Sequence, residues 1–140
     1  MQVIRIEHPS TGHGPYRSNR QCLEILNREF EAARQPTIQD DFPRELLDVV
    51  DSQFDHSRHM FGFRDSSQCV RWFNDRERQA IIDAGFAVNV YEVPDAWQGN
   101  SQVVFDIRAA KLVAHIHPDR FLSGDLNMLL AAEQENDPHQ

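Results

Sequence analysis

Near the start of the chain, apolar and polar residues alternate over residues 2–7, as in a strand that is buried on one side. Ile4 and Ile6 fall on one face of this predicted strand, and Arg5 falls on the other. Later stretches have the apolar content or the alternation of strands, and turn-forming residues bound several of them. Together they predict a mixed sheet of four or five strands, with the later strands over residues 59–63, 86–94, 101–107 and 111–118.

Helical spacing of apolar residues fills much of the chain between these strands. A first amphipathic helix is predicted over residues 20–34, with Phe30 and Ala33 on its apolar face, and Gln35-Pro36 is expected to stop it. A second helix is predicted over residues 43–54. Three further helices are predicted: one after the capping residues Asp65, Ser66 and Ser67, one ending at Gly85, and one containing Leu126, Leu129 and Leu130.

Length and composition fit one α+β domain. The chain has 140 residues, of which 40% are hydrophobic and 26% charged, so it can form one core and is not typical of disorder. We expect a single domain over residues 1–134 and a frayed tail over residues 135–140. Its core should be a mixed split β-sheet with helices inserted in the first half.

Charge, cysteines and hydropathy narrow the class of protein. A net charge of −8 argues against direct nucleic-acid binding and permits a partner with a basic surface. Cys22 and Cys69 each fall on the apolar side of a helical pattern, which favours buried reduced thiols over a disulfide. No apolar run approaches the roughly 18 residues of a membrane span, and no secretory signal is present. We therefore expect a cytoplasmic protein without a membrane partner.

Familiar motifs for metal or phosphate chemistry are missing from the sequence. It contains no Walker loop, no G-x-S-x-G elbow and no dinucleotide-binding glycine fingerprint. His56 and His59, like His115 and His117, are closely spaced, but no cysteine joins either pair in a known zinc pattern. No metal site is expected.

Polar residues from several predicted elements form the strongest candidate site. Arg5 projects from the first strand, and Ser66 and Ser67 stand at a helix start, where free N–H groups favour an anion. Gln102 and Asp106 share one side of a late strand. These groups could hold a ligand that carries phosphate and ribose. Each also has a plainer interpretation, since Arg5, Gln102 and Asp106 could face solvent and the serines could only cap the helix.

The loop "RIEHPSTGHGPYRS", residues 5–18, follows the first strand directly. Its glycines could exist only for backbone turns, and Tyr16 could cover the edge of the core. The loop is also rich in donors, including His8, and lies where a phosphate held by Arg5 would sit. The sequence leaves both interpretations open.

The segments "VIRIEH", "FGFRDSSQCVRWF", "VNVYEVP" and "SQVVFDI" resemble the ordered landmarks of the ADP-ribosyltransferase-like superfamily. The resemblance implies a split β-core with a central NAD⁺ cleft. It extends to small phage-borne proteins, including certain anti-CRISPR proteins that modify a host protein. By this resemblance, Arg5 takes the first motif position, Ser66 or Ser67 the second, and Gln102 the third.

The resemblance also implies roles for individual residues. Arg5, His8, Ser66 and Ser67 would hold NAD⁺, Tyr16 or Phe61 would stack on nicotinamide, and Gln102 or Asp106 would steady the ribose. The family usually has glutamate where Gln102 stands, and a neutral amide stabilises an oxocarbenium-like charge poorly. Asp106 or Glu92 could substitute for it; otherwise the domain binds NAD⁺ without turnover.

The acidic side of the second predicted helix supports an alternative function. On a helix that turns by 100° per residue, its carboxylates fall within a sector of roughly 120° around the helix axis. Such a stripe is often only a solvated face, but it could imitate nucleic-acid phosphates and block a basic surface of a host protein. The alternative is thus a non-enzymatic acidic inhibitor that binds through Asp41, Glu45, Asp48, Asp51 and Asp55.

Overall fold

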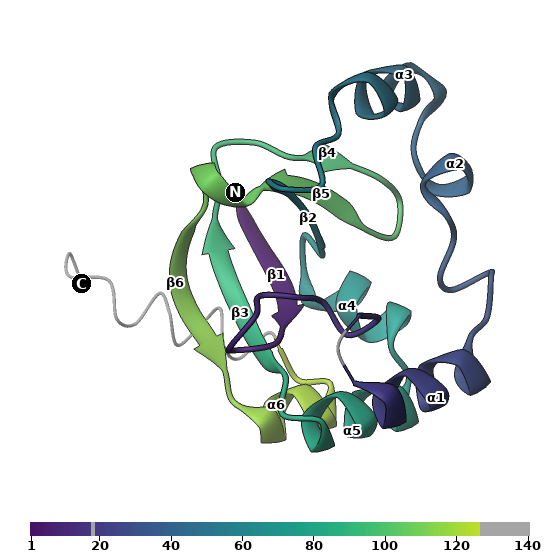
Figure 1. Cartoon of the computed structure of the whole chain (residues 1–140), viewed down its shortest axis with the longest axis vertical. Helices are drawn as coiled ribbons and strands as arrows, with labels where there is room; N and C mark the ends of the chain where they lie inside the picture. The colour runs from purple at the N-terminus through teal and green to yellow at the C-terminus, as the bar shows by residue number, and fades with distance from the viewer. Residues whose placement is uncertain (18, 127–140) are drawn as a thin grey trace.

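The structure, a computed structural model, describes residues 1–17 and 19–126 (Figure 1). The order of helices and strands along the described residues shows no repeated structural unit. The strands are β1 (Gln2–Glu7), β2 (His59–Gly62), β3 (Ala87–Glu92), β4 (Trp97–Gln98), β5 (Val103–Asp106) and β6 (Lys111–Ile116). The helices are α1 (Arg20–Glu29), α2 (Ile38–Asp41), α3 (Arg44–Gln53), α4 (Ser66–Trp72), α5 (Asp75–Asp83) and α6 (Pro118–Ser123), with a 3₁₀ turn over Ile107–Ala109.

Two three-stranded sheets form the β-core. One has the order β1-β3-β6 and the other the order β2-β5-β4, and every strand pair in the described residues is antiparallel. The sheets meet where Ile4 and Phe63 exchange two backbone hydrogen bonds, of 2.7 and 2.8 Å. The α+β class and the split of the core are therefore confirmed, whereas the described strand pairs are all antiparallel and do not form the predicted mixed sheet.

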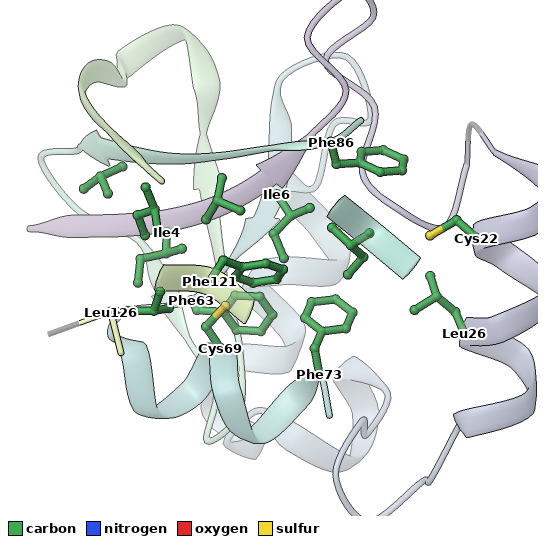
Figure 2. Packing of buried hydrophobic residues seen from close by; sticks show 14 residues of the cluster. Ile4, Ile6, Cys22, Leu26, Phe63, Cys69, Phe73, Phe86, Phe121 and Leu126 are labelled. Carbon is green, nitrogen blue, oxygen red and sulfur yellow. The ribbon is translucent and has the colours of Figure 1, made fainter. Parts of the chain in front are cut away.

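The main hydrophobic core lies between the β1-β3-β6 sheet and the helices α1, α4, α5 and α6. Ile4 and Ile6 point into it from β1, as their alternation predicts, and Val88 and Val90 do so from β3. Figure 2 shows this cluster, in which aromatic and cysteine side chains from the helices and from the segments beside them pack together. Packing on one face leaves the opposite face of β1 and β3 free for polar residues.

Smaller clusters join the second sheet to the rest of the molecule. Val3, Val93, Val103 and Phe105 pack between the sheets. Phe42 and Val50 of the α2–α3 region pack on Val104 of β5, which fixes that region against the second sheet.

The predicted elements are mostly present, with several corrections. The helix predicted over residues 20–34 ends at Glu29, and Phe30 is 55% exposed instead of lying on an apolar face. Ala33 is exposed as well. The short elements β4, α2 and α6 were not predicted. Leu126 is buried, whereas Leu129, Leu130 and the predicted tail lie outside the described residues.

Both cysteines are free and buried, as predicted. Cys22 lies on the inner face of α1, and Cys69 lies on that of α4. Burial raises the pKa of the Cys22 thiol to about 11 and that of Cys69 to about 12. Both are therefore protonated core residues at neutral pH.

The described residues contain no helix that is long and apolar enough to cross a membrane. Within the same part of the chain, no group of three or more His, Cys, Asp or Glu side chains could hold a metal ion.

Candidate functional site

A cavity of about 1070 Å³ opens on the polar face of the β1-β3-β6 sheet. Polar residues of β1, β3 and β6 line it, together with the loop of residues 8–17, the segment of residues 36–38 and the aromatic residues of β2. Its size lies slightly above the range of roughly 300–1,000 Å³ that is usual for ligand pockets. The cavity is therefore the candidate site.

Arg5 joins three parts of this cavity. Its Nε donates to Glu7 Oε2 at 3.0 Å, one terminal nitrogen donates to the Phe61 carbonyl at 2.8 Å, and the other donates to the Gly12 carbonyl at 2.8 Å. The residue is only 5% exposed. The guanidinium thus holds the opening loop and β2 against β1, and it acts first as a positioning group.

Glu7 is the centre of a buried polar cluster on the same sheet face. Its Oε1 accepts a hydrogen bond from Asn89 Nδ2 at 2.6 Å and another from the Tyr91 hydroxyl, while Oε2 faces Arg5. Burial, together with the hydrogen bond to Glu7, raises the pKa of Tyr91 to about 12. The register brings these residues together, since Arg5 pairs with Asn89 and the strand period is two.

The opening loop both turns the chain and forms the rim of the cavity. The amide of His8 donates to the His13 carbonyl, and the amide of Gly12 donates to the His8 carbonyl, both at 2.8 Å. Gly12 has a φ of 73°, which side chains other than glycine rarely adopt. Because Arg5 donates a hydrogen bond to the Gly12 carbonyl, this turn is fixed over the cavity. The loop therefore makes the predicted backbone turn and also lines the cavity.

Tyr16 lies near the end of the loop of residues 8–17. Its hydroxyl accepts a hydrogen bond from Trp72 Nε1 at 3.0 Å, and its ring stacks on Phe73 with centroids 6.3 Å apart. Although 41% of the residue is exposed, desolvation of the hydroxyl raises the pKa of Tyr16 to about 12. The tyrosine therefore covers the edge of the core and also lines the cavity.

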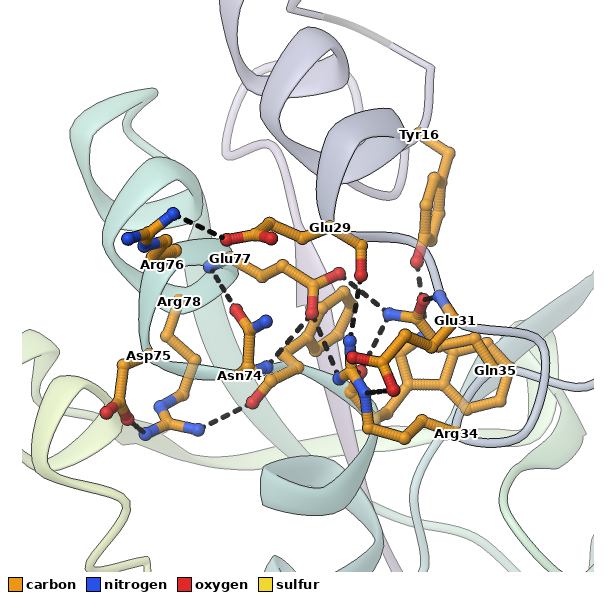
Figure 3. A network of polar contacts seen from close by, with 12 residues as sticks. Tyr16, Glu29, Glu31, Arg34, Gln35, Asn74, Asp75, Arg76, Glu77 and Arg78 are labelled. Atoms are coloured by element: carbon orange, nitrogen blue, oxygen red, sulfur yellow. Dashed lines mark hydrogen bonds and ion pairs between the residues drawn. The ribbon is translucent and has the colours of Figure 1, made fainter.

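A buried glutamate fixes the wall formed by residues 36–38. Glu77 is fully buried and accepts hydrogen bonds from Arg34 Nη1 at 3.1 Å and Gln35 Nε2 at 2.7 Å. Figure 3 shows Arg34 and Gln35 beside Glu77. The same two residues also donate to the Trp72 carbonyl. Gln102 then donates from Nε2 to the Pro36 carbonyl at 3.2 Å, which ties this segment to the start of β5.

The side chains that line the cavity include more cationic groups than carboxylates, whereas the chain as a whole is acidic. Among the described lining residues, Glu7 supplies the only carboxylate. Two arginines and five histidines surround the same space, in a chain with a net charge of −8. Such a lining favours an anionic ligand. The arginines and histidines of the lining are Arg5, Arg17, His8, His13, His56, His59 and His115.

A family model described as Bacteriophage T4 Y00F protein matches residues 1–119. The chain belongs to this family. This family match confirms the expectation of a small phage protein. No curated protein and no solved structure matches the chain. All elements that build the cavity lie within the part that matches the family.

The structure of this family member brings together some of the predicted site residues and not others. The predicted residues that line the cavity are Arg5, His8, Tyr16, Phe61 and Gln102. Ser66 and Ser67 begin α4 outside the lining, and Asp65 is the residue that caps the helix, by accepting from Gln68 N at 2.9 Å.

The two carboxylates considered as substitutes for a catalytic glutamate also lie outside the lining. Asp106 pairs with Arg58, and hydrogen bonding from Arg58 lowers the pKa of that carboxyl. Glu92 pairs with the amino terminus at 2.9 Å. Both carboxylates are thus engaged elsewhere.

One member of the predicted acidic stripe is not on the surface. Asp41 ends α2, is 3% exposed, and accepts from the Ser101 amide at 2.9 and 3.1 Å. It therefore holds the β4–β5 turn and cannot contact a partner. The stripe that the structure retains consists of the exposed residues Glu45, Asp48, Asp51 and Asp55.

Sequence reasoning missed the polar residues that accompany Arg5 in the cavity. These are Glu7, Asn89, Tyr91 and His115. One signal was present, because Glu7 has the same strand parity as Arg5, and Asn89 and Tyr91 have the parity opposite to Val88 and Val90. The pairing of β3 with β6 is needed to add His115.

Proposed function

We propose that the cavity binds NAD⁺ and that the protein is an ADP-ribosyltransferase-like phage protein that modifies a host component. The observation that carries this proposal is the lining of the cavity, which combines a cationic and histidine-rich surface with exposed aromatic rings. The cationic and histidine-rich surface suits phosphates, and the exposed aromatic rings suit a nicotinamide or adenine ring. The split core agrees with the arrangement that the resemblance to the superfamily implies.

In this proposal some residues contact NAD⁺, and others hold the loop and the wall of the cavity in place. Phe61 is 41% exposed in the cavity and is placed to stack on a ring of the ligand. His8 and His13 lie on the rim, where they would face the phosphates. Arg5 and Gln102 hold the loop and the wall, and the amide of Gln102 would steady the ribose. The reaction would be attack on the nicotinamide-bearing ribose carbon by a nucleophile of the host component.

Thermal unfolding with and without millimolar NAD⁺ tests this proposal. A ligand at 100 times its dissociation constant stabilises a protein by about 2.7 kcal/mol, which raises the melting temperature of a domain of this size by several degrees. We expect that shift in the parent protein and a smaller one in Phe61→Ala, because the substitution removes a stacking surface.

The matched control is Phe30→Ala, which removes another exposed phenylalanine that lies outside the cavity. It should keep the full shift. No shift in the parent protein, or equal shifts in both variants, would contradict binding in this cavity. The exposed carboxylates of α3 and the acidic-inhibitor function would then be examined, by measuring how steeply partner binding weakens with salt.

A further inference from the structure

A chain of hydrogen bonds runs across the β1-β3-β6 sheet and ends at a histidine in the cavity. Arg5 Nε donates to Glu7, and Asn89 Nδ2 donates to the same carboxylate. Asn89 Oδ1 then lies 2.6 Å from His115 Nδ1. The residues come from three adjacent strands, and the register pairs Arg5 with Asn89 and Asn89 with His115.

The donors and acceptors in this chain have only one consistent direction. The Glu7 carboxylate, paired with Arg5, only accepts hydrogen bonds, so the nitrogen of the Asn89 amide must face it. The amide oxygen of Asn89 therefore faces His115 and also only accepts. Consequently, His115 Nδ1 must carry a proton. The neutral imidazole is then the tautomer with an unprotonated Nε2.

Nε2 of His115 is available to a ligand. The side chain lines the cavity and the residue is exposed. Among the residues that the structure describes, Nε2 has no hydrogen-bond partner. An imidazole whose Nδ1 is held by an asparagine and whose Nε2 is unprotonated has the form of a general base.

We propose that His115 is the general base of this site and that Asn89 and Glu7 are its positioning residues. This inference rests on the proposed function. The oxygen or nitrogen of the attacking group forms a bond to the ribose carbon that carries nicotinamide. The bond from that carbon to the nicotinamide nitrogen breaks, and its electron pair leaves with nicotinamide. The proton of the attacking group goes to His115 Nε2.

The proposal distinguishes His115 from two other histidines of the lining, His8 and His59. His59 accepts from the Asp55 amide at Nδ1 (2.8 Å), and His8 accepts from the Ser10 amide at Nδ1 (3.2 Å). In both of these rings Nδ1 is an acceptor, so the neutral ring carries its proton on Nε2. They can donate to a phosphate, but their neutral forms cannot accept a proton at Nε2.

The tautomer of His115 is measurable without any ligand. Nitrogen-15 NMR of histidine-labelled protein should show a protonated Nδ1 and an unprotonated Nε2 at His115. Asn89→Ala should abolish this preference, and Asn27→Ala, an exposed asparagine on α1, should leave it unchanged. A protonated Nε2 in neutral His115 of the parent protein would overturn the proposal.

Release of nicotinamide from NAD⁺, with water as the attacking group, tests the catalytic role. We expect His115→Asn to slow this release on the order of 100-fold or more at an unchanged NAD⁺-induced thermal shift. His117→Asn is the matched control, because His117 lies two residues away, outside the lining, and caps α6. It should retain the parent rate.

The outcomes separate this proposal from the one on which it rests. If NAD⁺ is bound and consumed but His115→Asn is as fast as the parent protein, the role of His115 is wrong and NAD⁺ binding stands. If the parent protein neither binds nor consumes NAD⁺, the proposed function fails and the role of His115 fails with it.

Discussion

Replacing Glu77 with alanine should lower the free energy of unfolding by about 3–5 kcal/mol, the usual effect of removing one partner from a buried ion pair. Glu77 is fully buried, and the substitution removes the carboxylate that accepts from Arg34 Nη1 and Gln35 Nε2, so that the Trp72 carbonyl is left as the acceptor of both. It also removes the reciprocal cap with Asn74 at the start of α5. Denaturant unfolding, followed by tryptophan fluorescence, measures the change.

The control for this experiment lies one residue earlier on the same helix. Arg76 forms an exposed ion pair with Glu29 at 3.5 Å, so Arg76→Ala should change the free energy of unfolding by less than about 1 kcal/mol. Glu77→Gln retains the size and the capping geometry and should be less harmful than Glu77→Ala. Equal stability of Glu77→Ala and Arg76→Ala would contradict the structure around residues 34–36.

The second large effect is expected at Gly62, where the two sheets cross. A Cβ at this position would lie 2.5 Å from Val3 Cγ1 and 2.8 Å from the Ile4 carbonyl oxygen. The backbone of β1 cannot retreat, because Ile4 and Phe63 are joined by two hydrogen bonds. Gly62→Ala should therefore destabilise the protein by about 1–3 kcal/mol, as overpacked cores do.

Gly14→Ala is the matched control for Gly62→Ala. A Cβ at Gly14 would meet its nearest atoms at 3.9 and 4.0 Å, which is ordinary contact. This substitution should be neutral or stabilise the protein by about 0.4–1 kcal/mol through the unfolded chain. Comparison of the two melting temperatures gives the result. If Gly62→Ala were as stable as Gly14→Ala, the close crossing of β1 and β2 would be wrong.

The strands were the most predictable part of the molecule, for a simple physical reason. Alternation in "VIRIE" depends only on local geometry, so it placed Ile4 and Ile6 in the core and Arg5 on the opposite face. The partners of Arg5 depend on the pairing of β1 with β3 and of β3 with β6. Those pairings join residues far apart in the sequence, and local patterns do not encode them.

The errors in the helices and the acidic stripe have similar causes. The apolar pattern of α1 continues past Glu29, but Arg34 and Gln35 bind the buried Glu77, and the chain leaves the helix at Phe30. Asp41 has helical spacing with the exposed carboxylates of α3, yet it binds the amide of Ser101, sixty residues away in the sequence. Tertiary contacts overrode local spacing in both places.

The most direct test of the account is a titration of nitrogen-15-labelled protein with millimolar NAD⁺, followed by amide chemical shifts. Binding in the cavity predicts shifts at the non-proline amides of residues 8–17, at Phe61 and at His115, with little change at Glu45, Asp48 and Asp51 of α3. Shifts confined to α3, or an unchanged spectrum throughout the titration, would contradict the claim that this cavity is a nucleotide site.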